Sequence, residues 1–272
     1  MTDGSTVIPA APSKATPSLL GVRQNIASLT ADEVAALRSG ITGMLALADD
    51  RGYEYWAGIH GLPLPMYCQH GSPLFLPWHR AYLYFFEQYL MDQEATVRLP
   101  WWDWADEQAI PDAYAQAQLP DGSDNPLAAA PIIGIPDSQF TEENVPRVSQ
   151  TFRQPDQGSA LPGPDDVAAV LALDDFSDFT GQLEQLHNQV HVWVGGTMGL
   201  IPLAAYDPIF WAHHTMIDRL WSLWQQTHPG AGAGTVPPDT PLAPFPSLNV
   251  GGTLDITGLG YSYAVSSSSA AP

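Results

Sequence analysis

The chain has 272 residues, of which 29 are acidic and nine basic, and its formal charge at pH 7 is −20. Such a charge repels nucleic acid and anionic membrane surfaces, so neither is expected as a partner. The single cysteine, Cys68, excludes an intramolecular disulfide. No run of about 18 apolar residues exists to span a bilayer, and an apolar content of 45% is typical of a folded chain with a sizeable core.

The two ends of the chain differ in composition from the rest. The first residues lack the basic start and apolar stretch of a secretory signal, so the default location is cytoplasmic, with export assisted by another protein as the alternative. We expect residues 1–20 to form a flexible tail and the serine-rich residues 265–272 a disordered one. We expect residues 21–264 to form a single domain with one core.

The apolar spacing predicts a mainly α fold, an antiparallel four-helix bundle with long irregular loops and few short strands. Thr30 and Glu33 form a capping box at the start of the first helix, and Asp207 is expected to cap the last. Glycine and proline predict a loop over 51–76 and an irregular insertion over 105–175 that packs on the domain. The four helices are expected at residues 28–50, 78–92, 179–194 and 207–228.

Histidine is the most informative residue type in the chain. His187 and His191 are four residues apart and share one helix face, and His214 lies one turn before Asp218. Burying so much imidazole without partners is costly, and a pair of metal ions would use the nitrogen lone pairs directly. The eight histidines are His60, His70, His79, His187, His191, His213, His214 and His228.

The donor set restricts the metal. Neutral imidazoles without paired thiolates suit copper or zinc. A zinc protease motif would need glutamate directly after His187, where this chain has Asn188. A di-iron bundle would need two Glu-x-x-His motifs, and Glu184 with His187 supplies one, which leaves di-iron as the weaker alternative.

Three sequence motifs resemble those of the type 3 copper proteins, specifically the tyrosinase and catechol oxidase (polyphenol oxidase) branch. They are FLPWHR at 75–80, HNQVH at 187–191 and DPIFWAHH at 207–214. The resemblance covers most of residues 23–263. It implies a binuclear copper centre held by histidines of the bundle.

The resemblance also implies the role of each histidine. His60, His70 and His79 would hold one copper ion, with His60 and His70 on loops, and the second ion would be held by His187, His191 and His214. The preceding His213 would lie behind the ligands.

Further residues follow from the same resemblance. Asp218 would orient a ligand imidazole by accepting its N–H, and Cys68 would be joined to His70 by a thioether bond. The motif Tyr261-Ser262-Tyr263 would close the domain, with Arg23 packed on it by a cation–π contact. Few residues follow this motif, so we expect no shielding C-terminal domain.

The implied activity is dioxygen-dependent oxidation of small phenols to o-quinones, including o-hydroxylation of monophenols. Asn188 and Glu184 would position a water that takes the phenol proton, and Ile201 would be a gate residue over the second copper ion. A copper-delivering partner is a further expectation. The alternatives are a catechol oxidase or o-aminophenol oxidase without strong monophenolase activity, and, in a different class, a hemocyanin-like oxygen carrier.

Overall fold

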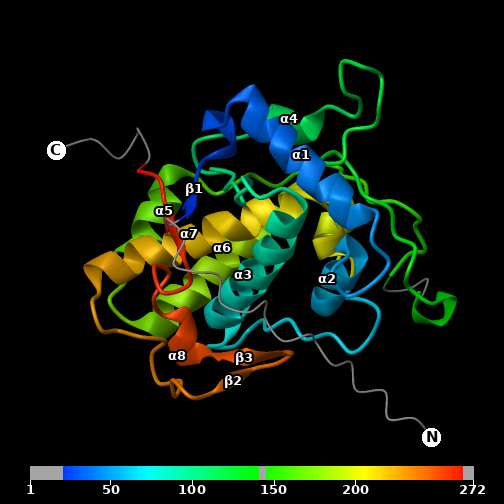
Figure 1. Cartoon of the computed structure of the whole chain (residues 1–272). Coiled ribbons are helices and arrows are strands. Elements are labelled where there is room, and N and C mark those ends of the chain that lie inside the picture. Colours follow the sequence, from blue (N-terminus) through cyan, green and yellow to red (C-terminus); the bar gives the residue numbers. More distant parts are fainter. Residues whose placement is uncertain (1–20, 141–144, 266–272) are drawn as a thin grey trace, which may run out of the picture.

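The computed structural model describes residues 21–140 and 145–265, and it confirms a mainly helical fold with few short strands (Figure 1). The tail expected at 1–20 lies outside the described residues, as does nearly all of the one expected at 265–272. Four helices are long: α1 (Ala31–Leu45), α3 (Phe75–Gln93), α6 (Phe176–Val194) and α7 (Ile209–Thr227). The shorter ones are α2 (Tyr53–His60), α4 (Asp112–Ala115), α5 (Pro164–Leu171) and α8 (Val250–Thr253).

Short 3-10 turns and strands complete the described chain. The turns are η1 (Ile26–Ser28), η2 (Asp137–Gln139), η3 (Gly196–Gly199) and η4 (Ala204–Tyr206). The strands are β1 (Gly21–Arg23), β2 (Pro241–Leu242), β3 (Phe245–Asn249) and β4 (Tyr261–Tyr263). Strand β1 pairs in parallel with β4, and β2 pairs antiparallel with β3. The β1–β4 pair therefore joins the two ends of the described chain (Figure 1).

The ends of the helices follow from local capping. The capping box is confirmed, because Glu33 N–H donates to Thr30 Oγ1 over 3.2 Å and Thr30 N–H donates to Glu33 Oε2 over 2.8 Å. Helix α6 begins three residues earlier than expected, because Asp175 accepts from the first-turn amides. Helix α3 also begins earlier, since Pro77 falls in its first turn, where no N–H donor is needed. Asp207 accepts from the Ile209 N–H at the start of α7.

The loop expected over 51–76 is wrong for its first part, which forms α2. Tyr53 and Trp56 on this helix are fully buried, which stabilises the helix against the core. Gly61 follows the helix, and a Cβ atom there would lie 2.1 Å from the Pro202 carbonyl oxygen. The glycine therefore permits a close approach of two backbones; it does not indicate a long loop.

The insertion over 105–175 is mostly irregular and packs on the helices. Arg153 anchors it, since its Nη2 lies 2.5 Å from Asp207 Oδ1 at the start of α7. The same guanidinium donates to the carbonyl oxygens of Tyr114 and Leu127. One buried ion pair thus connects three parts of the insertion to a histidine-bearing helix.

The core lies around α3 and α7, which pack against each other. All nine tryptophans are buried. Phe86 of α3 stacks on Trp211 of α7, with ring centroids 3.4 Å apart. Among the described residues, no helix has the length and apolarity that a membrane crossing requires. The aromatic packing makes α3 and α7 a rigid support for the histidines they carry.

Candidate metal centre

Six histidines predicted as ligands come together from four helices and one loop. His79 lies on α3, His187 and His191 on α6, and His214 on α7. His70 lies on the loop between α2 and α3, as expected. His60 was expected on a loop and is the last residue of α2, so that placement is wrong. Helix α1, which was expected to belong to the bundle, carries no histidine and packs against α3.

The second group of histidines converges on one point. His187 Nε2 lies 3.0 Å from His191 Nε2 and 3.1 Å from His214 Nε2, and the third separation is 3.4 Å. The Nδ1–H of His191 donates to the Met198 carbonyl oxygen over 2.8 Å, and that of His187 to Asn188 Oδ1 over 3.0 Å. An imidazole that donates from Nδ1 presents a lone pair at Nε2, so these nitrogens need a shared cation.

The first group is arranged in the same way. The ring centroids of His60, His70 and His79 lie 5.2 to 5.6 Å apart. His79 donates from Nδ1 to the Phe75 carbonyl oxygen over 2.8 Å, which leaves a lone pair on its Nε2. That Nε2 and both ring nitrogens of His60 are buried without a hydrogen-bond partner in the described structure. Unpaired buried nitrogens are costly unless they bind an ion.

The two groups lie next to each other. The rings of His79 and His214 stack with centroids 4.6 Å apart, and those of His70 and His187 are 5.6 Å apart. Donor atoms of His60, His79 and His214 all lie within 4.8 Å of one another. The side chains therefore form one histidine cluster that could hold metal.

Burial keeps the imidazoles neutral. Removal from water lowers the pKa of His70 and of His191 to about 4. It lowers the pKa of His60, His79, His187 and His214 well below the usual range, and neighbouring imidazoles add to the effect. A nitrogen must be deprotonated to bind a metal ion. These imidazoles are already neutral at pH 7, so copper could bind to them without first displacing a proton.

The match to known proteins agrees with this donor set. Residues 50–227 match the family model "Common central domain of tyrosinase". The chain belongs to the tyrosinase family. It is therefore a type 3 copper protein, as the sequence motifs predicted.

Relatives of this tyrosinase-family chain include both enzymes and oxygen carriers. A tyrosinase of Streptomyces glaucescens is 36% identical over 243 residues, covering 78% of this chain and 85% of that protein. Hemocyanin units G and H of Sepia officinalis are 31% identical over 217 residues, covering 75% of this chain. The chain spans only 37% of that hemocyanin. A solved functional unit of octopus hemocyanin has a TM-score of 0.74 at 29% identity, covering 90% of this chain and 68% of that one.

Two phenylalanines that were not predicted as site residues pack against the ligand rings of the tyrosinase-family site. The Phe210 ring lies 4.0 Å from that of His214 and 4.8 Å from that of His60. Phe75 lies 4.8 Å from His79 and 5.0 Å from His187. Each phenylalanine precedes a ligand histidine by four residues on the same helix, and this spacing is visible in the sequence.

His213 lies against the second group. Its ring is fully buried and stacks on His187, with centroids 5.1 Å apart. Both of its ring nitrogens lack a hydrogen-bond partner in the described structure. A donor atom of His213 lies within 4.8 Å of those of His187, His191 and His214, but the Nε2 contacts join only those three ligands.

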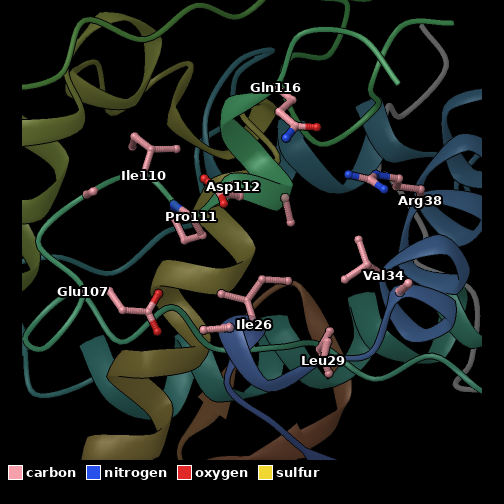
Figure 2. A pocket seen from close by; sticks show the side chains of 13 residues that line it. Ile26, Leu29, Val34, Arg38, Glu107, Ile110, Pro111, Asp112 and Gln116 are labelled. Atoms are coloured by element: carbon pink, nitrogen blue, oxygen red, sulfur yellow. The ribbon is translucent and has the colours of Figure 1, made fainter. Parts of the chain in front are cut away.

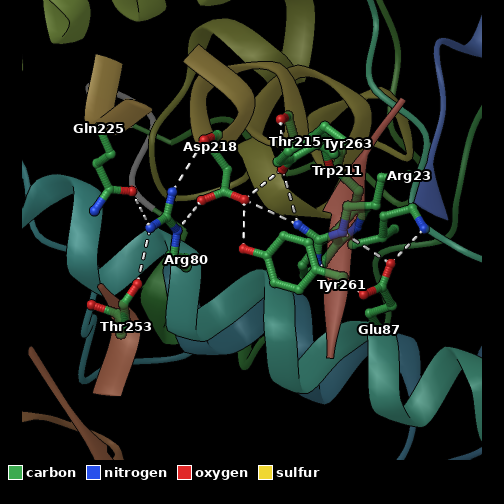
Figure 3. Close-up of polar contacts among 11 residues, drawn as sticks. Arg23, Arg80, Glu87, Trp211, Thr215, Asp218, Gln225, Thr253, Tyr261 and Tyr263 are labelled. Carbon is green, nitrogen blue, oxygen red and sulfur yellow. Dashed lines mark hydrogen bonds and ion pairs between the residues drawn. The ribbon is translucent and has the colours of Figure 1, made fainter. Parts of the chain in front are cut away.

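The role expected for Asp218 is wrong. Its Oδ1 accepts from Arg80 Nε over 2.5 Å, and its Oδ2 accepts from Arg23 Nη1 over 3.1 Å. The hydroxyl groups of Tyr261 and Tyr263 also donate to Oδ2. A fully buried carboxylate with four such donors has no oxygen directed at an imidazole, because α7 turns this residue toward the arginines (Figure 3).

The remaining predicted residues lie around the histidines. Glu184 is 8% exposed, and its Oε1 accepts from the Gly71 N–H over 2.7 Å, next to His70. Burial raises the pKa of the Glu184 carboxyl, and the Gly71 hydrogen bond opposes this. Cys68 Sγ lies within 4.8 Å of donor atoms of His60 and His70, and burial raises its pKa to about 11. Ile201 is 51% exposed.

A separate hollow of about 570 Å³ lies between the start of α1 and the segment 107–116. Ile26, Leu29 and Val34 line one side, and Glu107 and Ile110 the other (Figure 2). No histidine lines it, so this hollow is not part of the metal centre.

Proposed function

We propose that this chain oxidises phenols to o-quinones with dioxygen at two copper ions. The observation that carries the proposal is the pair of adjacent histidine groups, three neutral imidazoles in each, enclosed by aromatic side chains. Bound copper would supply dioxygen binding and two-electron oxidation, which no side chain provides. The polypeptide supplies orientation, exclusion of water and movement of protons.

Three of the predicted ligands are held in place by hydrogen bonds from their other ring nitrogens. The carbonyl oxygens of Phe75 and Met198 accept from His79 and His191, and Asn188 Oδ1 accepts from His187. Such bonds select the tautomer and fix the ring orientation. His60, His70 and His79 would hold one ion, and His187, His191 and His214 the other.

Monophenol hydroxylation needs a base, because a phenol with a pKa of about 10 is almost fully protonated at pH 7. We assign this task to a water held by Glu184 and Asn188. Glu184 is a carboxylate at the buried edge of the site, one helical turn before His187. Asn188 accepts from His187 through Oδ1, which directs its Nδ2 amide to donate to a water. The two residues together would hold the water and take the phenol proton.

Ile201 would form the wall of the entrance, as the gate residue. Its neighbour Pro202 accepts from the Leu62 N–H over 3.0 Å, two residues after His60. This hydrogen bond brings the backbone next to the half-exposed Ile201 close to the end of α2, which carries His60. As the gate residue over the second copper ion, this aliphatic side chain would leave room for a flat aromatic ring.

Cys68 and His70 would be joined by a thioether bond. Their donor atoms are close enough for this pairing, since they belong to one cluster within 4.8 Å. The bond between Sγ and a ring carbon would form as the S–H and C–H bonds break, and the two protons and two electrons released would pass to dioxygen, the oxidant of the proposed reaction, giving hydrogen peroxide. Mass spectrometry of the copper-loaded protein would show a loss of about two hydrogen atoms.

An oxygen carrier is the second candidate, because hemocyanin relatives are 31% identical and share the fold. Oxygen uptake by the copper-loaded protein with tyrosine, catechol and o-aminophenol separates the possibilities. Uptake with tyrosine and catechol, with o-quinone absorbance, is the expected result. Uptake with catechol or o-aminophenol alone would indicate an oxidase without hydroxylation. Reversible oxygen binding without turnover would identify a carrier.

A further inference from the structure

Basic residues are absent from the two stretches of sequence that build the site. No lysine or arginine lies between Arg51 and Arg80, or between Arg153 and Arg219. All six predicted ligands fall inside these two stretches. The second stretch is strongly acidic, with carboxylates at Asp156, Asp165, Asp166, Asp174, Asp175, Asp178, Glu184, Asp207 and Asp218.

The arginines that flank the two stretches are bound to other partners. Arg80 Nε lies 2.5 Å from Asp218 Oδ1, and Arg153 Nη2 lies 2.5 Å from Asp207 Oδ1. Arg51 pairs with Asp49 over 2.6 Å. Arg219 interacts with the charge of Asp103 and donates to the Met216 sulfur. Each of these four guanidinium groups therefore has an interaction partner in the described structure.

In the described part of the chain, an acidic side chain lies against the site, and apolar side chains are close to site residues in the sequence. Glu184 stands beside the His70 loop, bonded to the Gly71 N–H. Met66 lies two residues before Cys68, Val192 follows His191, and Ile201 is the proposed gate residue; their side chains are 43%, 59% and 51% exposed. A substrate carboxylate approaching here would lose water without gaining a cation, which costs free energy.

We propose that the site selects its substrates by the net charge on the ring substituent, accepting phenols whose substituent is neutral, zwitterionic or cationic and rejecting those whose substituent is a net anion. This inference rests on the proposed oxidation of phenols. An acidic, low-dielectric entrance raises the local concentration of cations and lowers that of anions, because the field of the whole chain acts in the same direction. The chain charge of −20 strengthens that field.

Three catechols that differ mainly in charge test the inference. Dopamine is a cation, 4-methylcatechol is neutral and 3-(3,4-dihydroxyphenyl)propionate is an anion at pH 7. Diphenols are used because their oxidation does not depend on the base assigned to Glu184 and Asn188. At 0.01 M ionic strength, kcat/KM for dopamine should exceed that for the propionate by roughly tenfold. At about 1 M salt the ratio should fall toward one, because the Debye length shrinks from about 30 Å to about 3 Å.

A matched pair of variants tests whether the selection by charge takes place at Ile201. Ile201→Lys places a cation at the entrance, and Ile201→Gln places a neutral polar group of similar length there. With 4-methylcatechol as the internal reference, the lysine variant should raise the relative kcat/KM of the propionate roughly tenfold at low salt. The glutamine variant should have the same ratio of kcat/KM for the propionate to kcat/KM for 4-methylcatechol as the parent protein.

The outcomes separate this inference from the function on which it rests. No oxygen uptake with any of the three catechols would refute the proposed function itself. Equal kcat/KM values, or a faster propionate, would overturn charge selection while leaving phenol oxidation standing. A preference for dopamine that does not change with salt would show that the shape of the substrate, and not its charge, determines kcat/KM. That result would also overturn the inference.

Discussion

Arg23 Nη1 lies 3.1 Å from Asp218 Oδ2, and the two residues are 195 positions apart in the sequence. Arg23 also pairs with Glu87 over 2.9 Å, and its guanidinium lies 3.7 Å above the Tyr261 ring (Figure 3). The expected cation–π contact is therefore confirmed. This network joins β1 and β4 to α3 and α7, the helices that carry His79 and His214.

Asp218→Asn should reduce the free energy of unfolding by about 3–5 kcal/mol, because it leaves Arg23 and Arg80 buried without their shared counter-charge. Burial alone would raise the pKa of the Asp218 carboxyl, but the two arginines outweigh burial and the net pKa is lowered. The carboxylate is therefore charged, and stabilising, throughout the neutral range. Urea unfolding at pH 7 measures the loss.

Asp239→Asn is the matched control, since Asp239 is exposed and the change is chemically the same. It should change the stability by less than about 0.5 kcal/mol. If both variants unfold at the same urea concentration, the network does not stabilise the fold.

The two adjacent histidines of α7 should differ in copper binding. His214→Asn should lower the copper content from about two ions to about one and abolish oxidation, because it removes one of the three converging Nε2 donors. His213→Asn should retain both ions. Metal analysis after dialysis against a weak chelator measures the content, and His228→Asn, at the end of α7, serves as a control. Loss of copper from the His213 variant instead would show that the ligand of this pair has been assigned to the wrong residue.

Glu184→Gln and Asn188→Asp should lower kcat for monophenols by roughly a hundredfold and for diphenols far less, because only monophenols need the assigned base. Initial rates with tyrosine and with catechol give the comparison. Gln185→Ala, at an exposed position next to Glu184 on α6, is the control and should affect neither rate. Equal losses with both substrates would show that the two residues support the site as a whole, without a role in proton transfer.

Cys68 in the metal-free protein should react slowly with iodoacetamide at pH 8.5. Burial raises its pKa to about 11, so the reactive thiolate is scarce below that pH, whereas a free cysteine with a pKa of about 8.5 would be half ionised. The alkylation rate should rise through pH 10 and 11. After copper loading in air, a thioether would abolish the reaction at every pH. Full alkylation of the copper-loaded, unfolded protein would exclude the crosslink.

Residue spacing alone determined the local features of this protein. The four-residue interval of His187 and His191 placed both on one face of α6, and the Thr30–Glu33 pattern located the start of α1. Both depend on contacts within a single helical turn, which a sequence displays directly. The three histidine motifs also identified the family, and with it copper.

Tertiary structure decided the features that join distant segments. The sequence around Gly61 is typical of a loop. In the structure, Gly61 directly follows α2 and lies against the Pro202 backbone, so His60 is the last residue of a helix. Asp218 reads as a partner of His214 one turn away, but two arginines and two tyrosines from other elements bind its oxygens more favourably. The partners of a buried charge are chosen by packing among segments far apart in the chain, and no local spacing records that choice.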